Sequence, residues 1–324
     1  MPQKPYKIVF FGTSDFAVPI LERLRGDADF SLLEVVTQPD KPAGRKRLLT
    51  APAVKRAAET FGLKVHQPAS IKDEAETAHF KELGADAYVV VSYGKILPKA
   101  LLEIPPFGGV NVHASLLPCY RGASPISAAI AAGEKETGIT VMKMDEKMDE
   151  GPTLATSRVP IGDEDTTETL SIKLARSAAE LIGPTLKLYL EGGIEPKPQA
   201  HEQASYCGIL KREDGRIDWS KGAVEIERFI RAMQPWPEAF THWARGGKPP
   251  LKLTIKKAAV LHPESKCDVS GAPGSVCKLS DGTVGVNCGA GSLTLKTVQL
   301  EGKKQADIKD FLNGHADFTG AVLA

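Results

Sequence analysis

The chain has 324 residues, of which 42% are hydrophobic and 25% are charged, as is ordinary for a globular protein. Its hydrophobicity is too high and its net charge, +1, too low for a chain that is disordered throughout. The richest apolar run, residues 87–91, is far shorter than the roughly 18 residues that a membrane span requires. The five cysteines are irregularly spaced and form no CxxC pair, which argues against a disulfide framework and a zinc site. We therefore expect a chain of about two domains, with no metal and no membrane contact, in a reducing cytoplasm.

Apolar runs alternate with helical patterns over the first 190 residues. Strands are predicted over 7–11, 32–37, 63–66, 87–92, 109–113, 138–143 and 153–159. Helices are predicted after Ser14, whose hydroxyl can cap the first one, and over 53–61, 74–83 and 167–190. This alternation predicts an α/β fold with an open, mostly parallel, Rossmann-like sheet and helices on both of its faces.

The pattern changes after residue 194. Residues 195–205 contain two prolines and few apolar side chains, which is typical of a linker. A helix over 223–232 and short strands over 251–257, 274–278, 284–288 and 293–300 follow, separated by Gly and polar clusters. We predict a catalytic domain over 1–194, a linker over 195–205 and a small C-terminal β-barrel domain over 206–324.

The turn after the first strand argues against a dinucleotide cofactor. Residues 12–17 hold Gly12 but neither of the further glycines of the Gly-x-Gly-x-x-Gly fingerprint. Side chains at those positions hinder the approach of the backbone to a pyrophosphate.

A long basic loop follows the second strand. Residues 38–47 carry Lys41, Arg45, Lys46 and Arg47 on a stem that contains two prolines. Long loops at the carboxyl ends of parallel strands lie over the active crevice, so this loop can grip phosphates. The charge run alone fits a solvated surface loop equally well.

The densest polar segment lies at the end of the strand over 109–113. Asn111 and His113 are two residues apart, so their side chains lie on one face of the sheet. Asp149 stands in a turn after a later strand and can supply a carboxylate to the same place. An amide, an imidazole and a carboxylate fit acid–base chemistry at a developing oxyanion. A hydrogen-bonded structural histidine and an ordinary turn aspartate explain the same pattern.

Taken together, these segments resemble the formyltetrahydrofolate-dependent transferases, in particular those that act on methionyl-tRNA. The matching segments run along nearly the whole chain, at residues 11–16, 38–45, 93–98, 111–118, 121–126, 136–140, 144–151, 216–219 and 235–237.

The resemblance implies that the first domain binds 10-formyltetrahydrofolate, with Ser115, Leu116, Leu117 and Pro118 lining the folate site. It implies that Asn111, His113 and Asp149 are catalytic and that no metal takes part. The formyl group moves to the α-amino group of methionine esterified to initiator tRNA. The second domain is then an OB-like, tRNA-binding barrel. The basic loop with Lys41, Arg45, Lys46 and Arg47 is then the insertion that enters the tRNA acceptor end, and the enzyme is expected to be a monomer.

Two features of the sequence bear on this interpretation, and three alternatives remain. Cys119 stands where the family usually has a basic residue, and its thiol is a conceivable nucleophile, although no partner histidine is evident. The length of the chain argues against a glycinamide ribonucleotide formyltransferase. A sugar-nucleotide formyltransferase, a formyltetrahydrofolate hydrolase and a non-catalytic tRNA-binding module are the remaining alternatives.

Overall fold

The computed structural model describes residues 4–44, 48–245, 248–262 and 271–324, which form two compact units. Unit 1 comprises residues 1–125, 136–160 and 171–208. Unit 2 comprises residues 126–135, 161–170 and 209–324. The two units are therefore not separated by a single cut in the sequence.

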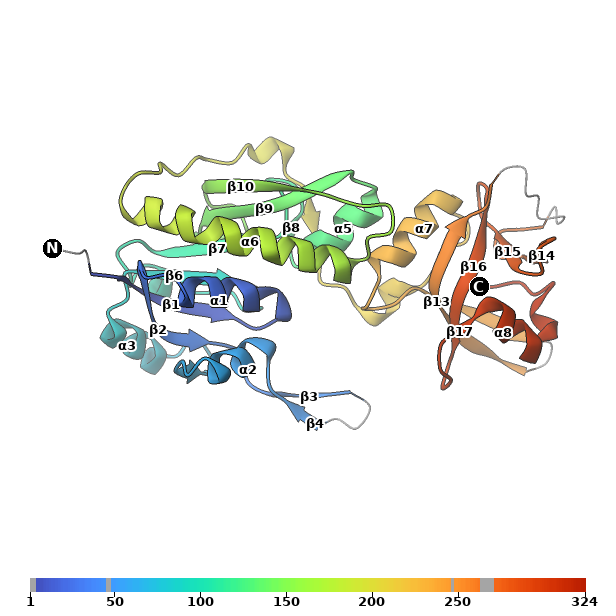
Figure 1. Ribbon diagram of the computed structural model, residues 1–324, viewed down its shortest axis with the longest axis horizontal. Helices are drawn as coiled ribbons and strands as arrows, with labels where there is room; N and C mark the ends of the chain where they lie inside the picture. Colours follow the sequence, from blue (N-terminus) through green and yellow to red (C-terminus); the bar gives the residue numbers. More distant parts are fainter. Residues whose placement is uncertain (1–3, 45–47, 246–247, 263–270) are drawn as a thin grey trace. The chain divides into compact units, whose positions relative to one another are not determined.

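A seven-stranded sheet forms the centre of unit 1 (Figure 1). In spatial order its strands are β10 (Thr153–Pro160), β9 (Glu136–Lys143), β7 (Gly109–His113), β6 (Ala87–Val91), β1 (Tyr6–Gly12), β2 (Phe30–Val36) and β5 (Val65–His66). Neighbours from β5 to β7 are parallel, whereas β9 is antiparallel to both β7 and β10. The predicted open, mostly parallel α/β sheet is confirmed.

Helices cover both faces of this sheet. The helices of the first 190 residues are α1 (Val18–Arg25), α2 (Ala53–Thr60), α3 (Glu74–Leu83), α4 (Lys99–Leu102), α5 (Pro125–Ala132) and α6 (Thr167–Leu190). On one face, Val9 and Phe11 of β1 pack against Phe80 of α3 and Leu101 of α4. β6 is buried along its whole length because both of its faces are covered, which explains its uninterrupted apolar sequence.

Two local predictions need correction. Ser14 does not cap a helix, because the chain first makes a 3-10 turn, η1 (Asp15–Ala17), and the Ser14 hydroxyl donates to Ser92 Oγ at 2.8 Å. The basic segment is not an irregular loop, because it contains a small antiparallel hairpin of β3 (Lys41–Ala43) and β4 (Leu48–Thr50).

An antiparallel sheet forms the centre of unit 2. Its strands, in spatial order, are β12 (Phe240–Arg245), β13 (Lys248–Val260), β16 (Ser292–Leu300), β15 (Val284–Asn287) and β14 (Val276–Lys278), with β17 (Ala306–Asp307) paired to β16. It is accompanied by η3 (Arg212–Gly215), α7 (Ala223–Ala232), α8 (Ile308–Gly314) and η4 (Ala316–Phe318). The sheet curls into a half-barrel, as the alternating strands predicted.

No helix among the described residues is long and apolar enough to cross a membrane. Cys119, Cys207 and Cys288 are free thiols, whereas Cys277 is disulfide-bonded. The cysteine spacing therefore did not predict the disulfide bond of Cys277.

Candidate active site

Asn111, His113 and Asp149 lie together at one end of the unit 1 sheet. Asn111 and His113 are the third and fifth residues of β7, so the two-residue period of the strand places both on one face. Asp149 reaches them from the turn between β9 and β10. Its Oδ1 accepts a hydrogen bond from Asn111 Nδ2 at 3.3 Å, and its Oδ2 lies 3.5 Å from His113 Nδ1.

The imidazole of His113 lies between two hydrogen-bond acceptors. Its Nε2 is 2.9 Å from the carbonyl oxygen of Tyr120, and its Nδ1 faces the Asp149 carboxylate. Only the doubly protonated ring can direct an N–H toward both acceptors. The side chain is 7% exposed, so this arrangement is largely screened from water. The ring is therefore held between a backbone carbonyl oxygen and a carboxylate.

The turn that carries Asp149 is held by backbone contacts. Asp149 has a φ of 55°, a left-handed conformation that Asp tolerates better than most residues. Its Oδ2 accepts a hydrogen bond from the backbone N–H of Gly122 at 2.9 Å. At Gly151 a Cβ would lie 1.9 Å from the carbonyl oxygen of Lys143, so only glycine fits the end of this turn. The carboxylate is thereby fixed relative to His113.

A buried arginine and a glutamine hold this turn through hydrogen bonds. Gln199 Nε2 donates to the carbonyl oxygens of Asp149 at 2.9 Å and Gly151 at 2.7 Å. Gln199 Oε1 accepts from Arg121, whose Nη2 lies 2.8 Å away and whose side chain is 1% exposed. Arg121 Nη1 also donates to the Tyr206 hydroxyl at 3.0 Å. Gln199 thus links the arginine to the backbone of the Asp149 turn.

The sequence interpretation did not include these supporting residues among the site residues. Arg121 lies in a segment that matches the family, and this was the one available signal. Gln199 falls in the predicted linker, where nothing pointed to a role. A two-stranded sheet of β8 (Arg121–Gly122) and β11 (Tyr206–Cys207) joins the two segments. η2 (His201–Gln203) lies between Gln199 and β11.

Cys207, in β11, contacts the same backbone carbonyl group as His113. Its Sγ lies 3.5 Å from the carbonyl oxygen of Tyr120, the group that also faces His113. Burial raises the pKa of the Cys207 thiol, and the Asp149 charge adds to the effect. The thiol therefore stays protonated and can donate to the carbonyl.

The segment predicted to line the folate site continues directly from β7. Ser115 is fully buried, and its Oγ donates to the carbonyl oxygen of Cys119 at 2.6 Å. Thr140 Oγ1 donates to the carbonyl oxygen of Ser115 and accepts from the backbone N–H of Leu117. Leu116, Leu117 and Pro118 are half-buried. The backbone of the segment is thereby fixed beyond the end of β7.

The structure describes one of the four basic residues predicted to bind tRNA. Lys41 is exposed on β3, and its Nζ donates to Gln38 Oε1. Arg45, Lys46 and Arg47 lie outside the described residues. Cys119 is exposed, and its Sγ lies 4.0 Å from the carbonyl oxygen of Gln203.

Comparison with known proteins identifies the family. Residues 6–185 match the formyl transferase family, and residues 209–316 match the formyl transferase C-terminal domain. Methionyl-tRNA formyltransferase of Sorangium cellulosum (strain So ce56) is 44% identical over 318 residues, which cover 98% of this chain and 99% of the relative. Methionyl-tRNA formyltransferase of Roseiflexus sp. (strain RS-1) is 44% identical over 310 residues, which cover 96% of this chain and 93% of the relative. The chain belongs to the formyl transferase family, and within it to the methionyl-tRNA formyltransferases.

Solved structures share the fold at low sequence identity. An N-formyltransferase from Helicobacter canadensis, in complex with folinic acid and dTDP-3-aminofucose, has a TM-score of 0.64 at 18% identity and covers 90% of this chain and 98% of its own. HypX from Aquifex aeolicus, in complex with tetrahydrofolic acid, has a TM-score of 0.59 at 15% identity and covers 96% of this chain and 47% of its own. At such identities the likeness concerns the fold alone.

Proposed function

We propose that this protein transfers the formyl group of 10-formyltetrahydrofolate to the α-amino group of methionine on initiator tRNA. The observation that carries the proposal is the convergence of Asn111, His113 and Asp149 in a chain of this family. The three side chains are the proposed catalytic residues. They supply an amide donor, an imidazole and a carboxylate, which are the groups that this reaction requires.

The proposed reaction is an acyl transfer without a covalent enzyme intermediate. The uncharged amine of methionine attacks the formyl carbon, a C–N bond forms, and the carbonyl oxygen gains negative charge. The second N–H of Asn111 Nδ2 stabilises that oxygen, and His113 adds a donor when its Nε2 turns from the carbonyl oxygen of Tyr120; one such donor is typically worth about 3–4 kcal/mol. Asp149 holds the ring of His113 through Nδ1 and accepts the proton that the amine loses. Collapse of the tetrahedral centre breaks the bond to the folate nitrogen, which takes up a proton.

The half-buried side chains of Leu116, Leu117 and Pro118 support a folate site beside this trio. They form an apolar wall that a flat pteridine ring can contact. Ser115 and Thr140 hold this wall through hydrogen bonds of the backbone. The wall therefore needs little rearrangement when the co-substrate binds.

The hairpin of β3 and β4 supports a contact with tRNA. Lys41 is exposed on one strand, and Leu48 and Leu49 on the other are 64% and 70% exposed. A hairpin that presents a cation and apolar side chains to solvent is suited to an anionic partner with stacked bases. We assign this role to Lys41, Arg45, Lys46 and Arg47, and we assign the β-domain over 206–324 as the further tRNA-binding part.

We propose that residues 1–194 carry out catalysis and that residues 206–324 bind tRNA; residues 195–205, expected as a linker, lie within unit 1. We expect a single chain to suffice, because all three proposed catalytic residues belong to one unit. Methionyl-tRNA is a substrate of translation, so the proposed reaction takes place in the cytoplasm.

The test is to incubate the purified protein with Met-tRNA and 10-formyltetrahydrofolate and to measure how much methionine becomes N-blocked. His113→Ala should lower kcat by about 100- to 1,000-fold, the usual loss for one oxyanion donor. Binding of tRNA should stay within a few-fold of the parent protein, and Lys72→Ala, at an exposed residue of unit 1, serves as the control. Near-normal turnover at saturation by His113→Ala would contradict the mechanism. Formylation of a sugar nucleotide, or hydrolysis of the folate alone, would assign one of the alternative functions.

A further inference from the structure

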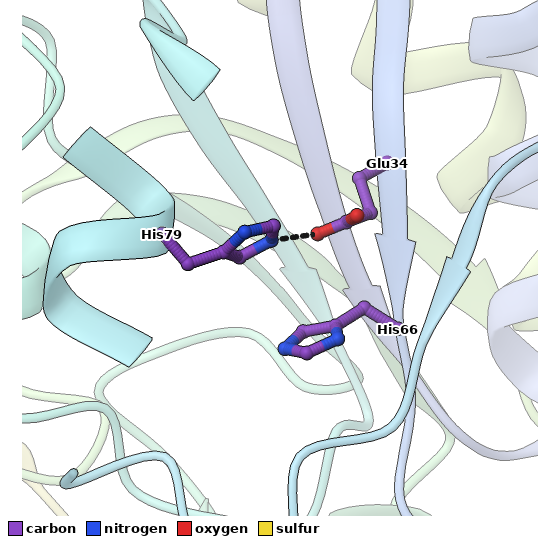
Figure 2. Close-up of side chains that lie close together, drawn as sticks. All are labelled: Glu34, His66 and His79. Carbon is purple, nitrogen blue, oxygen red and sulfur yellow. Dashed lines mark hydrogen bonds and ion pairs between the residues drawn. The ribbon is translucent and has the colours of Figure 1, made fainter. Parts of the chain in front are cut away.

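A second cluster of polar side chains lies on another part of the unit 1 sheet. Figure 2 shows Glu34 from β2, His66 from β5 and His79 from α3 directed toward one another. β2 and β5 pair in parallel with Val36 opposite His66. Glu34 therefore lies on the same face as His66, the face on which Val36 packs against Phe80 of α3. Three separate segments of the chain thus bring their side chains to one point.

Glu34 is an unusual residue for this place. It is a fully buried carboxylate in the middle of a strand whose neighbours are apolar. Its Oε2 accepts a hydrogen bond from His79 Nε2 at 2.7 Å. Its Oε1 forms an ion pair with Lys64 Nζ at 2.9 Å. Burying a carboxylate costs free energy unless a nearby cation compensates its charge. Glu34 therefore requires a positively charged partner.

Burial alone raises the pKa of Glu34, but its hydrogen bonds and charge interactions with His79 and Lys64 outweigh this effect, so the pKa is lowered. The arrangement that matters for binding is geometric, because one buried carboxylate lies next to two imidazoles.

The donor set is that of a transition-metal site. One donor atom each from Glu34, His66 and His79 lie within 4.8 Å of one another. Two imidazoles and a carboxylate are the protein ligands of many zinc sites that keep a fourth position open for water. We propose that Glu34, His66 and His79 bind one divalent transition-metal ion of the zinc class.

Glu76 supports the site from outside. Its Oε2 lies 2.6 Å from His66 Nε2, and a carboxylate against one nitrogen of an imidazole fixes the ring so that the other nitrogen can bind a metal. Two carboxylates, Glu34 and Glu76, thus lie against the two imidazoles, with Lys64 on the second oxygen of Glu34.

Binding requires small movements only. Ligand atoms of tetrahedral zinc lie about 3.3 Å apart, given zinc–nitrogen distances near 2.05 Å. The contact between His79 Nε2 and Glu34 must therefore open by roughly half an ångström, and the widest separation must shrink by about 1.5 Å. His66 and His79 are 28% and 29% exposed, so an ion can enter from solvent and both rings can adjust. Lys64 can keep its contact with Glu34 Oε1.

The test is equilibrium binding of Zn²⁺ to the untagged, chelator-treated protein, with Co²⁺ absorption as a second readout of tetrahedral coordination. We expect one ion per chain at the cluster and an upward shift of the unfolding temperature with Zn²⁺ but not with Mg²⁺. His66→Gln and His79→Gln should each raise the Kd by more than 100-fold. Glu76→Gln should raise it by about 10- to 100-fold, as is usual for a residue that contacts a ligand rather than the metal.

The control variant is His242→Gln, which removes a half-buried histidine of unit 2 and should leave the Kd unchanged. Each variant is first compared with the parent protein by circular dichroism, so that loss of binding is not confused with loss of folding. Equal zinc affinity in His66→Gln, His79→Gln and the parent would overturn the proposal. No stoichiometric binding to a folded parent protein would also overturn it, and the cluster would then be a charge network only. The proposal does not depend on the proposed formyl transfer, since neither outcome involves turnover.

Discussion

Gln199 is the side chain on which the position of Asp149 depends most. Its amide donates to two carbonyl oxygens of the Asp149 turn and its oxygen accepts from the buried Arg121. Without it, two carbonyl groups lose their donor inside the protein, at a cost of about 1–3 kcal/mol. Gln199 is thus a positioning residue for the proposed reaction.

We predict that Gln199→Leu lowers kcat by up to about 100-fold, because a displacement of about 1 Å in a catalytic group can cost that much. The KM values for folate and for Met-tRNA should change little, because Gln199 is not proposed to touch either. Steady-state kinetics with both substrates varied make the measurement. Gln203→Leu, an exposed glutamine four residues further on, is the control. A rise in either KM with normal kcat would place Gln199 in a binding role instead.

The convergence of Asn111, His113 and Asp149 was predictable from the sequence, whereas the contacts that support it were not. Asn111 and His113 share a face because strands have a period of two, and no tertiary information was needed. Asp149 followed from the turn after β9. Arg121 and Gln199 are 78 residues apart, and no local pattern relates residues at such a distance. The same reason hid the Glu34, His66 and His79 cluster.

Cys119 provides a test of the nucleophile alternative. Its thiol contacts one carbonyl oxygen at 4.0 Å and has no histidine partner in its hydrogen bonds. We predict that Cys119→Ser keeps kcat/KM within about two- to threefold, since exposed substitutions usually change free energies by less than about 0.5 kcal/mol. Kinetics of formyl transfer by the variant decide the matter. A loss of several orders of magnitude would restore the thiol as a nucleophile.

At the scale of elements, the two-residue strands β8 and β11 decide whether the active-site turn is held. Gly122 in β8 has a φ of +114°, and a Cβ there would lie 2.1 Å from the carbonyl oxygen of Cys207 in β11. The backbone N–H of Gly122 also donates to Asp149. A side chain at this position must push the two strands apart and withdraw that donor.

We predict that Gly122→Ala lowers both the free energy of unfolding and kcat. Gly62→Ala is the matched control, because Gly62 also has positive φ, +69°, but no atom lies within 4 Å of the added Cβ. The control should lose about 1–3 kcal/mol through backbone strain alone. Denaturant unfolding and kcat, measured for both variants, separate strain from displacement. Equal effects of the two substitutions would show that the Cys207 contact is unimportant.

The longer elements were well predicted and the shorter ones were not. The helices over 74–83, 167–190 and 223–232 have the predicted bounds, because their apolar spacing extends over several turns. The hairpin of β3 and β4 was missed because its strands have three residues each, one with a proline and one with exposed leucines. β12 and α8 were missed in a region where Gly and polar residues interrupt the pattern.

At the scale of the molecule, formal charges nearly cancel, so attraction to a polyanion must come from local clusters. We predict that raising salt from about 50 to about 200 mM increases the KM for Met-tRNA steeply and that for the folate only slightly, because phosphate contacts release counterions. Lys41→Ala should reduce the slope of log KM against log salt by about one. Kinetics across a salt series make the measurement. Lys72→Ala, another exposed lysine of unit 1, is the control. The same slope in both variants would remove Lys41 from the tRNA contact.

The fold class could be predicted as a whole because apolar strands alternating with helices permit few arrangements. The order of strands and the antiparallel β9 and β10 could not, because pairing partners leave no mark on the local sequence. Residues 126–135 and 161–170 belong to unit 2, and the sequence did not predict this for the same reason.

The return of residues 199–207 to the site has a consequence for how the protein is made. A ribosome releases the three proposed catalytic side chains well before it releases Gln199, which holds the Asp149 turn, and Ser205, whose Oγ accepts from the backbone N–H of Tyr120 at 2.8 Å. A nascent chain that ends at residue 194 has every strand of the large sheet but neither of these fastenings. During synthesis, the strands of the large sheet are therefore complete before the contacts that hold the Asp149 turn can form.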